Sequence, residues 1–131
     1  MTETYRQLRS LIGANSSGRF DVVQTELARL GLEPRVYDLK SGDEIKRYSK
    51  HLSVQLESAP GLSEVWLTAN YDTGKDLPGA NNNASGIVTL IELSEQLMGE
   101  TLPVNVRFLY FGQGLDPSLA KTGRRNPDFV P

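Results

Sequence analysis

The segment 65–86 most strongly constrains what this chain can fold into. It opens with the apolar run 65–69, which is too short for a helix and rich in β-forming residues, so we expect a buried central strand. A proline–glycine turn and three consecutive asparagines then remove any periodicity. Helical spacing of apolar residues begins at Ala84. This order of strand, polar loop and helix start is where open α/β sheets usually place a ligand site.

The helix that starts near Ala84 is expected to pack one apolar side on a sheet. That side consists of Ile87, Leu90, Ile91, Leu97 and Met98. Asn83 is a candidate N-cap, and Gly99 stands where a glycine commonly ends a helix. The next apolar run, 104–111, predicts a second strand that stops at Gly112.

The residues before this segment predict two helices and two strands. Apolar spacing favours helices over 4–12 and over 20–30, the second one ending at Gly31. An extended piece is expected over 35–40. Residues 49–57 alternate between apolar and polar side chains, with Leu52, Val54 and Leu56 on one face. This alternation indicates a half-exposed strand near a sheet edge.

Length and charge narrow the class of protein. With 131 residues we expect one domain over 1–131, in which the proline-rich segment 116–131 is an irregular tail. A net charge of -2 offers no basic surface for nucleic acid and no attraction to anionic membranes. The absence of cysteine excludes a disulfide framework. No apolar signal segment follows Met1, so we expect a cytoplasmic protein without membrane or nucleic-acid partners.

Three polar features have both a structural and a functional interpretation. His51 stands alone on a strand, where a structural or surface role is the commoner one. The asparagines 81–83 either satisfy turn geometry and cap a helix or line a ligand site, and we favour the first. Asp72 and Asp76 lie in one loop, but two carboxylates without further ligands are a poor site for calcium or magnesium.

Three motifs resemble those of the M28 family of zinc aminopeptidases. They are TANYDT, PGANNNASGIVTLIEL and VRFLYFGQGL. The family shows a strand ending in His-x-Asp, then Pro-Gly-Ala-Asn-Asp-Asn-Ala-Ser-Gly at the start of a helix, then a strand ending in Glu-Glu. The resemblance extends from about Gly13 and is densest over 64–115. It implies a three-layer α/β/α domain with a mixed sheet of about four strands, order 1-2-4-3, as in the first half of a zinc-dependent exopeptidase domain.

At the first two motifs the chain departs from the family's site residues. The resemblance places Asn70 at the metal-binding histidine and Asn82 at the aspartate that bridges two metal ions. Asp72 is retained, but its counterpart in the family orients the histidine. An asparagine offers zinc only a neutral carbonyl oxygen, whereas zinc sites use imidazole, thiolate or carboxylate ligands.

At the third motif the Glu-Glu pair, one base and one metal ligand in the family, is replaced by Gly114 and Leu115. Gln113 is the nearest polar residue if the loop is shifted. The resemblance implies that the family's later ligands belong to a second half of the domain, for which we expect no counterpart in these 131 residues. With no cysteine and one histidine in the sequence, we assign no catalytic residue and no metal ligand, and the zinc expected of the family is not supported.

The missing second half also changes the expectation for the strand 64–70. In the family this strand is flanked by strands from that half, whereas here it becomes an edge. Long apolar edges pair with other chains. We therefore expect a homo-oligomer, and the candidate contact residues are Val65, Trp66, Leu67, Thr68 and Ala69.

Two functions remain open from the sequence. The one we favour is a non-catalytic peptidase-like binding or structural module that associates with itself, with any peptide or protein partner unidentified. The alternative is a residual metal-dependent hydrolase of aminopeptidase type, with ligands that the sequence does not locate or that a partner chain supplies. A weaker third interpretation is a truncated or decayed gene product without a selected function.

Overall fold

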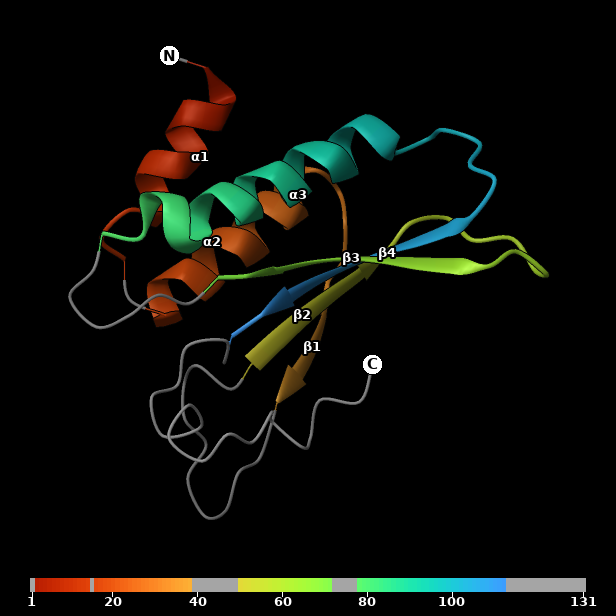
Figure 1. Cartoon of the computed structure of the whole chain (residues 1–131), viewed down its shortest axis with the longest axis horizontal. Coiled ribbons are helices and arrows are strands. Elements are labelled where there is room, and N and C mark those ends of the chain that lie inside the picture. The colour runs from red at the N-terminus through yellow and green to blue at the C-terminus, as the bar shows by residue number, and fades with distance from the viewer. Residues whose placement is uncertain (1, 15, 39–49, 72–77, 113–131) are drawn as a thin grey trace.

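The computed structural model describes residues 2–14, 16–38, 50–71 and 78–112. The elements follow one another in the order helix, helix, strand, strand, strand, helix, strand (Figure 1). They are α1 (Glu3–Leu11), α2 (Ser16–Arg29), β1 (Arg35–Asp38), β2 (Lys50–Gln55), β3 (Glu64–Asn70), the π-helical turn η1 (Ala80–Ala84), α3 (Ser85–Leu97) and β4 (Asn105–Phe111). Among these residues no helix is both long enough and apolar enough to cross a membrane.

The four strands form one mixed sheet in the order β1-β2-β4-β3. β2 is antiparallel to both β1 and β4, and β3 is parallel to β4, with Leu67 opposite Phe108. A parallel pair needs a crossover connection, and α3 supplies it. The predicted α/β class, mixed sheet and strand order are therefore confirmed.

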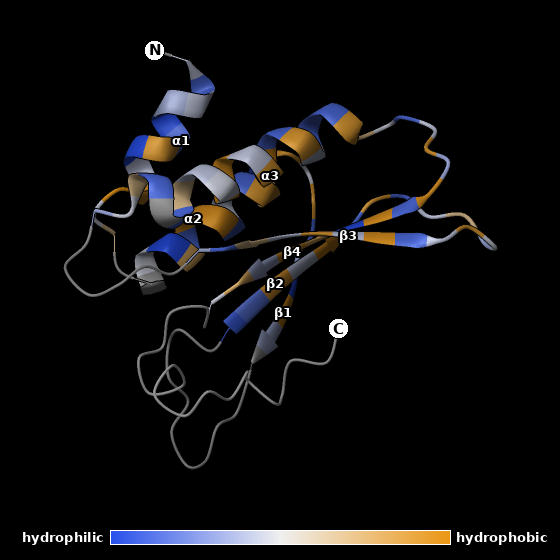
Figure 2. Cartoon of the chain, viewed as in Figure 1, coloured by the Kyte–Doolittle hydropathy of each residue, from blue (hydrophilic) through white to orange (hydrophobic). Residues whose placement is uncertain are grey.

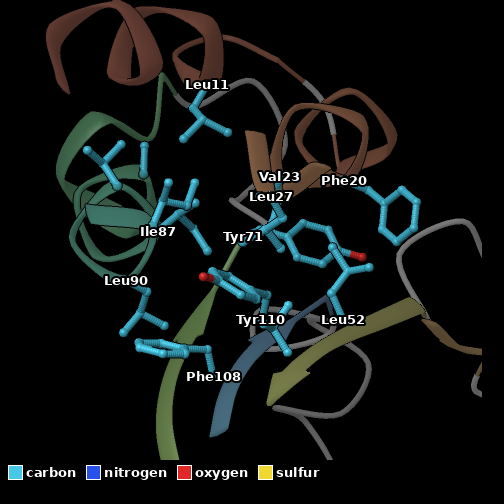
Figure 3. Packing of buried hydrophobic residues seen from close by; sticks show 14 of the residues in the cluster. Leu11, Phe20, Val23, Leu27, Leu52, Tyr71, Ile87, Leu90, Phe108 and Tyr110 are labelled. Carbon is cyan, nitrogen blue, oxygen red and sulfur yellow. The ribbon is translucent and has the colours of Figure 1, made fainter. Parts of the chain in front are cut away.

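All three helices lie on one face of the sheet (Figure 1). Two of the three expected layers are thus seen in the described part of the chain. Between them, side chains from α3 meet those of β4 and β2, as Figure 3 shows. The fully buried members of this core include Leu11, Val23, Leu27, Leu52, Ile87, Ile91, Phe108 and Tyr110. In Figure 2 hydrophobic colour gathers where α3 faces the sheet.

α1 and α2 are joined through the buried carboxylate of Glu26. Arg6 Nη2 donates to its Oε1 at 2.6 Å, while Gln7 Nε2 and Arg29 Nε donate to its Oε2, each at 3.0 Å. Burial alone would raise the pKa of Glu26, but these hydrogen bonds outweigh it and hold the pKa below its usual range. The carboxylate is therefore charged at neutral pH and holds the two helices together.

Two of our expectations for the strands are wrong. β3 is not the central buried strand that its apolar run suggests: among the described strands only β4 pairs with it, so it lies at an edge, as the resemblance implied. Val65 and Trp66 remain 40% and 38% exposed. β2 is not half-exposed, because β1 and β4 flank it and Arg107 Nη1 reaches Ser53 Oγ at 3.4 Å. His51 and Ser53, on its polar face, are both buried.

The start of the α3 region also differs from expectation. Asn83 is not an N-cap, because the chain is already helical from Ala80 and continues through η1 into α3. At the other end, Met98 is an exposed end residue and not part of the apolar side. Gly99 has φ +76° and follows the last turn as expected. The expected tail, 116–131, lies outside the described residues.

Candidate functional site

The carboxyl ends of β3 and β4 meet the start of the α3 region. Asn70 ends β3 and lies beside Phe111, the last residue of β4. Its side chain is half-buried. This is the position where open α/β sheets bind ligands, and it is where the sequence motifs place their site.

A buried arginine holds both ends of the loop that follows β3. Arg19, on α2, is fully buried. Its guanidinium donates to Tyr71 O at 3.1 Å, to Pro78 O at 3.0 Å and to Gly79 O at 3.3 Å. Its Nε donates to Ala14 O at 3.2 Å. One cation therefore ties α2 to the residues on either side of 72–77, using a rigid fork of donors that only arginine provides.

Sequence reasoning missed Arg19, although the sequence contains a signal for it. Arg19, Val23 and Leu27 recur at i, i+4 and i+8, and all three are fully buried. A lone charge on the apolar side of a helix needs hydrogen-bond partners inside the protein. Here the partners are backbone carbonyl oxygens at the site.

The helical segment itself begins with an unusual turn. Gly79 has φ +65°, a left-handed conformation that favours glycine. Ala84 N–H then donates to Gly79 O at 3.0 Å, a π-helical bond. The loop is further tied to the N-terminal region by Gly13 N–H, which donates to Pro78 O at 3.0 Å. Single π turns are frequent at functional sites, and this one lies where the sequence motifs place their site.

His51 supports the end of β4 from the neighbouring strand. Its Nδ1 accepts a hydrogen bond from Gly112 N–H at 3.0 Å, and its ring meets Phe111 edge-on with centroids 5.3 Å apart. Burial lowers the pKa of His51, so the imidazole is neutral at pH 7. The backbone bond occupies the nitrogen lone pair that a metal ion would need, which agrees with a structural role.

Tyr71 links the site to the core. Its hydroxyl donates to Lys50 O at 2.6 Å, and its N–H donates to Phe111 O at 2.8 Å. The ring meets Phe20 edge-on at 6.1 Å (Figure 3). The first residue after β3 is thereby fixed to α2, β2 and β4, and the strand ends are held firmly in place.

The described residues do not fit a zinc ion. Asn70 offers only an amide, which is a poor zinc ligand. Asn82 lies within η1, but its side chain is outside the described part, as are Asp72, Gln113, Gly114 and Leu115. Across 2–14, 16–38, 50–71 and 78–112, no group of three or more His, Cys, Asp or Glu is placed to hold a metal ion.

β3 is the second candidate site, because it forms one edge of the sheet within the described part of the chain. Ser63 O accepts from Asn105 N–H, and Tyr71 N–H donates to Phe111 O, both at 2.8 Å. Because backbone groups alternate along a strand, odd-numbered residues of β3 direct theirs toward β4 and even-numbered residues direct theirs outward. The outward set is Glu64, Trp66, Thr68 and Asn70.

The charge at the beginning of β3 is neutralised locally. Arg107 Nε donates to Glu64 Oε1 at 2.8 Å, and Trp66 Nε1 donates to the same oxygen. These bonds, the one from Arg107 first, hold the pKa of Glu64 below its usual range. The remainder of the edge, from Val65 to Ala69, carries no charge.

The comparisons with known proteins agree with this geometry. The model of peptidase family M28 matches residues 52–113. The structure of human carnosine dipeptidase 1 superposes with a TM-score of 0.65 at 18% identity, over 90% of this chain and 33% of that chain. Fimbriiglobus ruber glutaminyl cyclase gives 0.61 at 17%, over 82% and 43%, and Porphyromonas gingivalis glutaminyl cyclase gives 0.58 at 17%, over 96% and 51%. A comparison with curated protein sequences gave no match.

These likenesses show the fold. The chain carries an M28-like domain, with the mixed sheet found in zinc exopeptidase-like proteins. It spans between 33% and 51% of the length of the three solved structures named above.

Proposed function

We propose that this chain is a non-catalytic peptidase-like module that associates with itself through β3. The observation that carries the proposal is the edge position of β3, whose side chains at Val65 and Trp66 remain 40% and 38% exposed. The resemblance to M28 proteins supplies the framework, and the residues at the expected site supply the argument against catalysis.

The residues at the expected site lack the ligand chemistry of a zinc hydrolase. The two positions at which the resemblance expects a histidine and a bridging aspartate hold Asn70 and Asn82. Each change leaves a neutral amide, and the second also removes a negative charge that would offset a dication. The base position holds Gly114 or Leu115, neither of which can accept a proton from water.

The β3 edge favours self-association because it lacks the features that usually protect a sheet edge. Natural sheet edges are commonly blunted by lysine, proline, inward charges, bulges or short length. β3 is seven residues long, and its one charged residue, Glu64, is bound to Arg107. A two-fold contact is the commonest way to cover such an edge, because the same surface then covers itself.

Cleavage of aminoacyl-nitroanilides with added zinc, cobalt or manganese tests the first part of the proposal. We expect no metal-dependent rate. The matched control is the double variant Asn70→His and Asn82→Asp, which we also expect to be inactive because the base is still absent. A wild-type rate that follows metal content and persists after repurification, with stoichiometric bound metal, would establish the residual hydrolase instead. The second part, self-association, is tested by measuring the molar mass of the protein in solution at several concentrations.

A further inference from the structure

We infer that the partner of β3 is a second copy of this chain, paired antiparallel about a two-fold axis at Leu67. This inference rests on the proposed self-association and adds the register of the contact. It follows from which backbone groups β3 directs outward and from the side chains that the pairing brings together.

The outward backbone groups favour one register. An antiparallel pair forms two hydrogen bonds between residues that both direct their N–H and C=O groups at the partner. A two-fold axis at Leu67 places Glu64 opposite the partner's Asn70 and Trp66 opposite the partner's Thr68. All four outward residues of β3 are then paired, giving about eight interchain hydrogen bonds. An axis at Trp66 or at Thr68 leaves one end of the outward set without an opposite residue on β3.

The side chains are compatible with the same register. On the face that carries the helices, Leu67 lies opposite the partner's Leu67, and Val65 lies opposite the partner's Ala69. Both are pairs without mutual backbone bonds, in which side chains approach most closely. On the other face, the ring of Trp66 lies beside the partner's Thr68. Glu64 faces the partner's Asn70, so no like charges lie directly opposite each other.

The pairing explains the exposure pattern of β3. Val65 and Trp66, which are 40% and 38% exposed, lie on opposite faces of the strand and both gain a neighbour. The sheet becomes continuous across the two-fold axis, with β3 and the partner's β3 at its centre. Each copy then has β1 as its remaining edge.

The chain contains no cysteine, so a single introduced cysteine reports on its own neighbours. In the proposed register the two copies of Leu67→Cys lie opposite each other, with Cα atoms about 4.5 Å apart. That separation is within the range of a disulfide. The two copies of Val65→Cys are four positions apart along the strands, about 13 Å, and do not bridge.

The experiment is mild oxidation of these variants followed by non-reducing electrophoresis. We expect Leu67→Cys to form a covalent dimer and Val65→Cys alone to form none. A mixture of Val65→Cys and Ala69→Cys is expected to bridge, and it repeats the test without altering the half-buried Leu67. Light scattering on the reduced variants and circular dichroism confirm that each is folded and associated.

The outcomes separate the inference from the proposal on which it rests. A folded dimer in which neither Leu67→Cys nor the mixture bridges overturns the register and leaves self-association standing. Efficient bridging of Val65→Cys with itself likewise overturns the register. A folded protein that stays monomeric and does not bridge overturns both the register and the proposed function.

Discussion

Among the four strands that the structure describes, β1 and β3 form the two edges of the sheet, and they differ in length and charge more than in exposure. β1 has four residues and carries Arg35 and Asp38 at its ends, whereas β3 has seven and carries only Glu64. Each edge exposes a valine to nearly the same extent, 37% for Val36 and 40% for Val65. A single exposed apolar residue therefore does not identify a contact. A long apolar edge is the stronger candidate, because shortness and charge are among the features that keep edges from pairing.

The two sides of the sheet also differ in their cover. α3 packs on β3 and β4, and the side chains of Ile87 and Ile91 are fully buried there. At β1, Arg35 places its guanidinium over the ring of Tyr37 at 5.0 Å, which adds a charge to that edge. The side of the sheet that α3 covers thus ends in the apolar edge strand β3.

The first expected effect is on association, where the two edges should differ most. Trp66→Lys places a charge within the β3 edge and should weaken the dimer at least about 30-fold, as loss of a central interface tryptophan does. Val36→Lys is the matched control on β1 and should leave the dissociation constant unchanged. Sedimentation of both variants measures this. Equal weakening by the two changes would show that the edges do not differ as proposed.

The next effect is on stability. Ile91→Ala empties space beneath α3 and should lower the free energy of unfolding by about 2–5 kcal/mol. Val36→Ala, at the exposed edge, should cost about 1 kcal/mol or less. Urea denaturation of both variants gives the comparison. Similar costs would mean that the core does not lie where the helices cover the sheet.

A smaller effect is expected at the end of β3. Arg19→Lys keeps the charge but cannot reach all the carbonyl oxygens that the guanidinium binds, so we expect a loss of about 2–4 kcal/mol. Amide exchange at Tyr71 should also become faster. Arg9→Lys, on the exposed side of α1, is the control and should cost less than about 1 kcal/mol. If both changes cost the same, the hydrogen bonds of Arg19 are not what fixes the carboxyl end of β3.

The smallest expected effect is on the contact between α1 and α2, which lies away from both edges of the sheet. Because the pKa of Glu26 is lowered in the folded protein, its contribution is complete above the ordinary glutamate pKa of about 4.3 and is lost as pH falls through the folded-state value. Glu26→Gln should cost about 1–2 kcal/mol at pH 7 and remove that part of the acid sensitivity.

The matched check is association, which Glu26→Gln should leave unchanged, because the described contacts of Glu26 join α1 to α2. Denaturation from pH 7 to pH 3 and sedimentation at pH 7 measure the two effects. A wild-type protein whose stability does not fall with acid more steeply than that of the variant would contradict the assignment.

The elements of the fold could be predicted from the sequence, because periodicity and glycine positions mark them directly. Helix α2 ends before Gly31, which has φ +79°, as its spacing predicts. The strand order came from the resemblance, since no local pattern says which strands are neighbours. Hydrophobicity alone placed β3 in the centre of the sheet, and this was wrong because apolar content reports burial or contact without distinguishing them.

The candidate site could be predicted only in part. The motif positioned Asn70 at the end of β3, but it did not reveal the π turn that replaces an N-cap at Asn83. Nor did it reveal Arg19, whose partners are backbone oxygens far along the chain. Backbone acceptors carry no side-chain signature. A buried arginine bound to them is therefore visible in the sequence only as a charge on an apolar helix face.

The central claim is that β3 joins two copies of this chain, and sedimentation equilibrium of the whole chain tests it most directly. At micromolar concentration, we expect a species of twice the 14.5 kDa chain mass that dissociates on dilution. A single species of 14.5 kDa across the concentration range would contradict it.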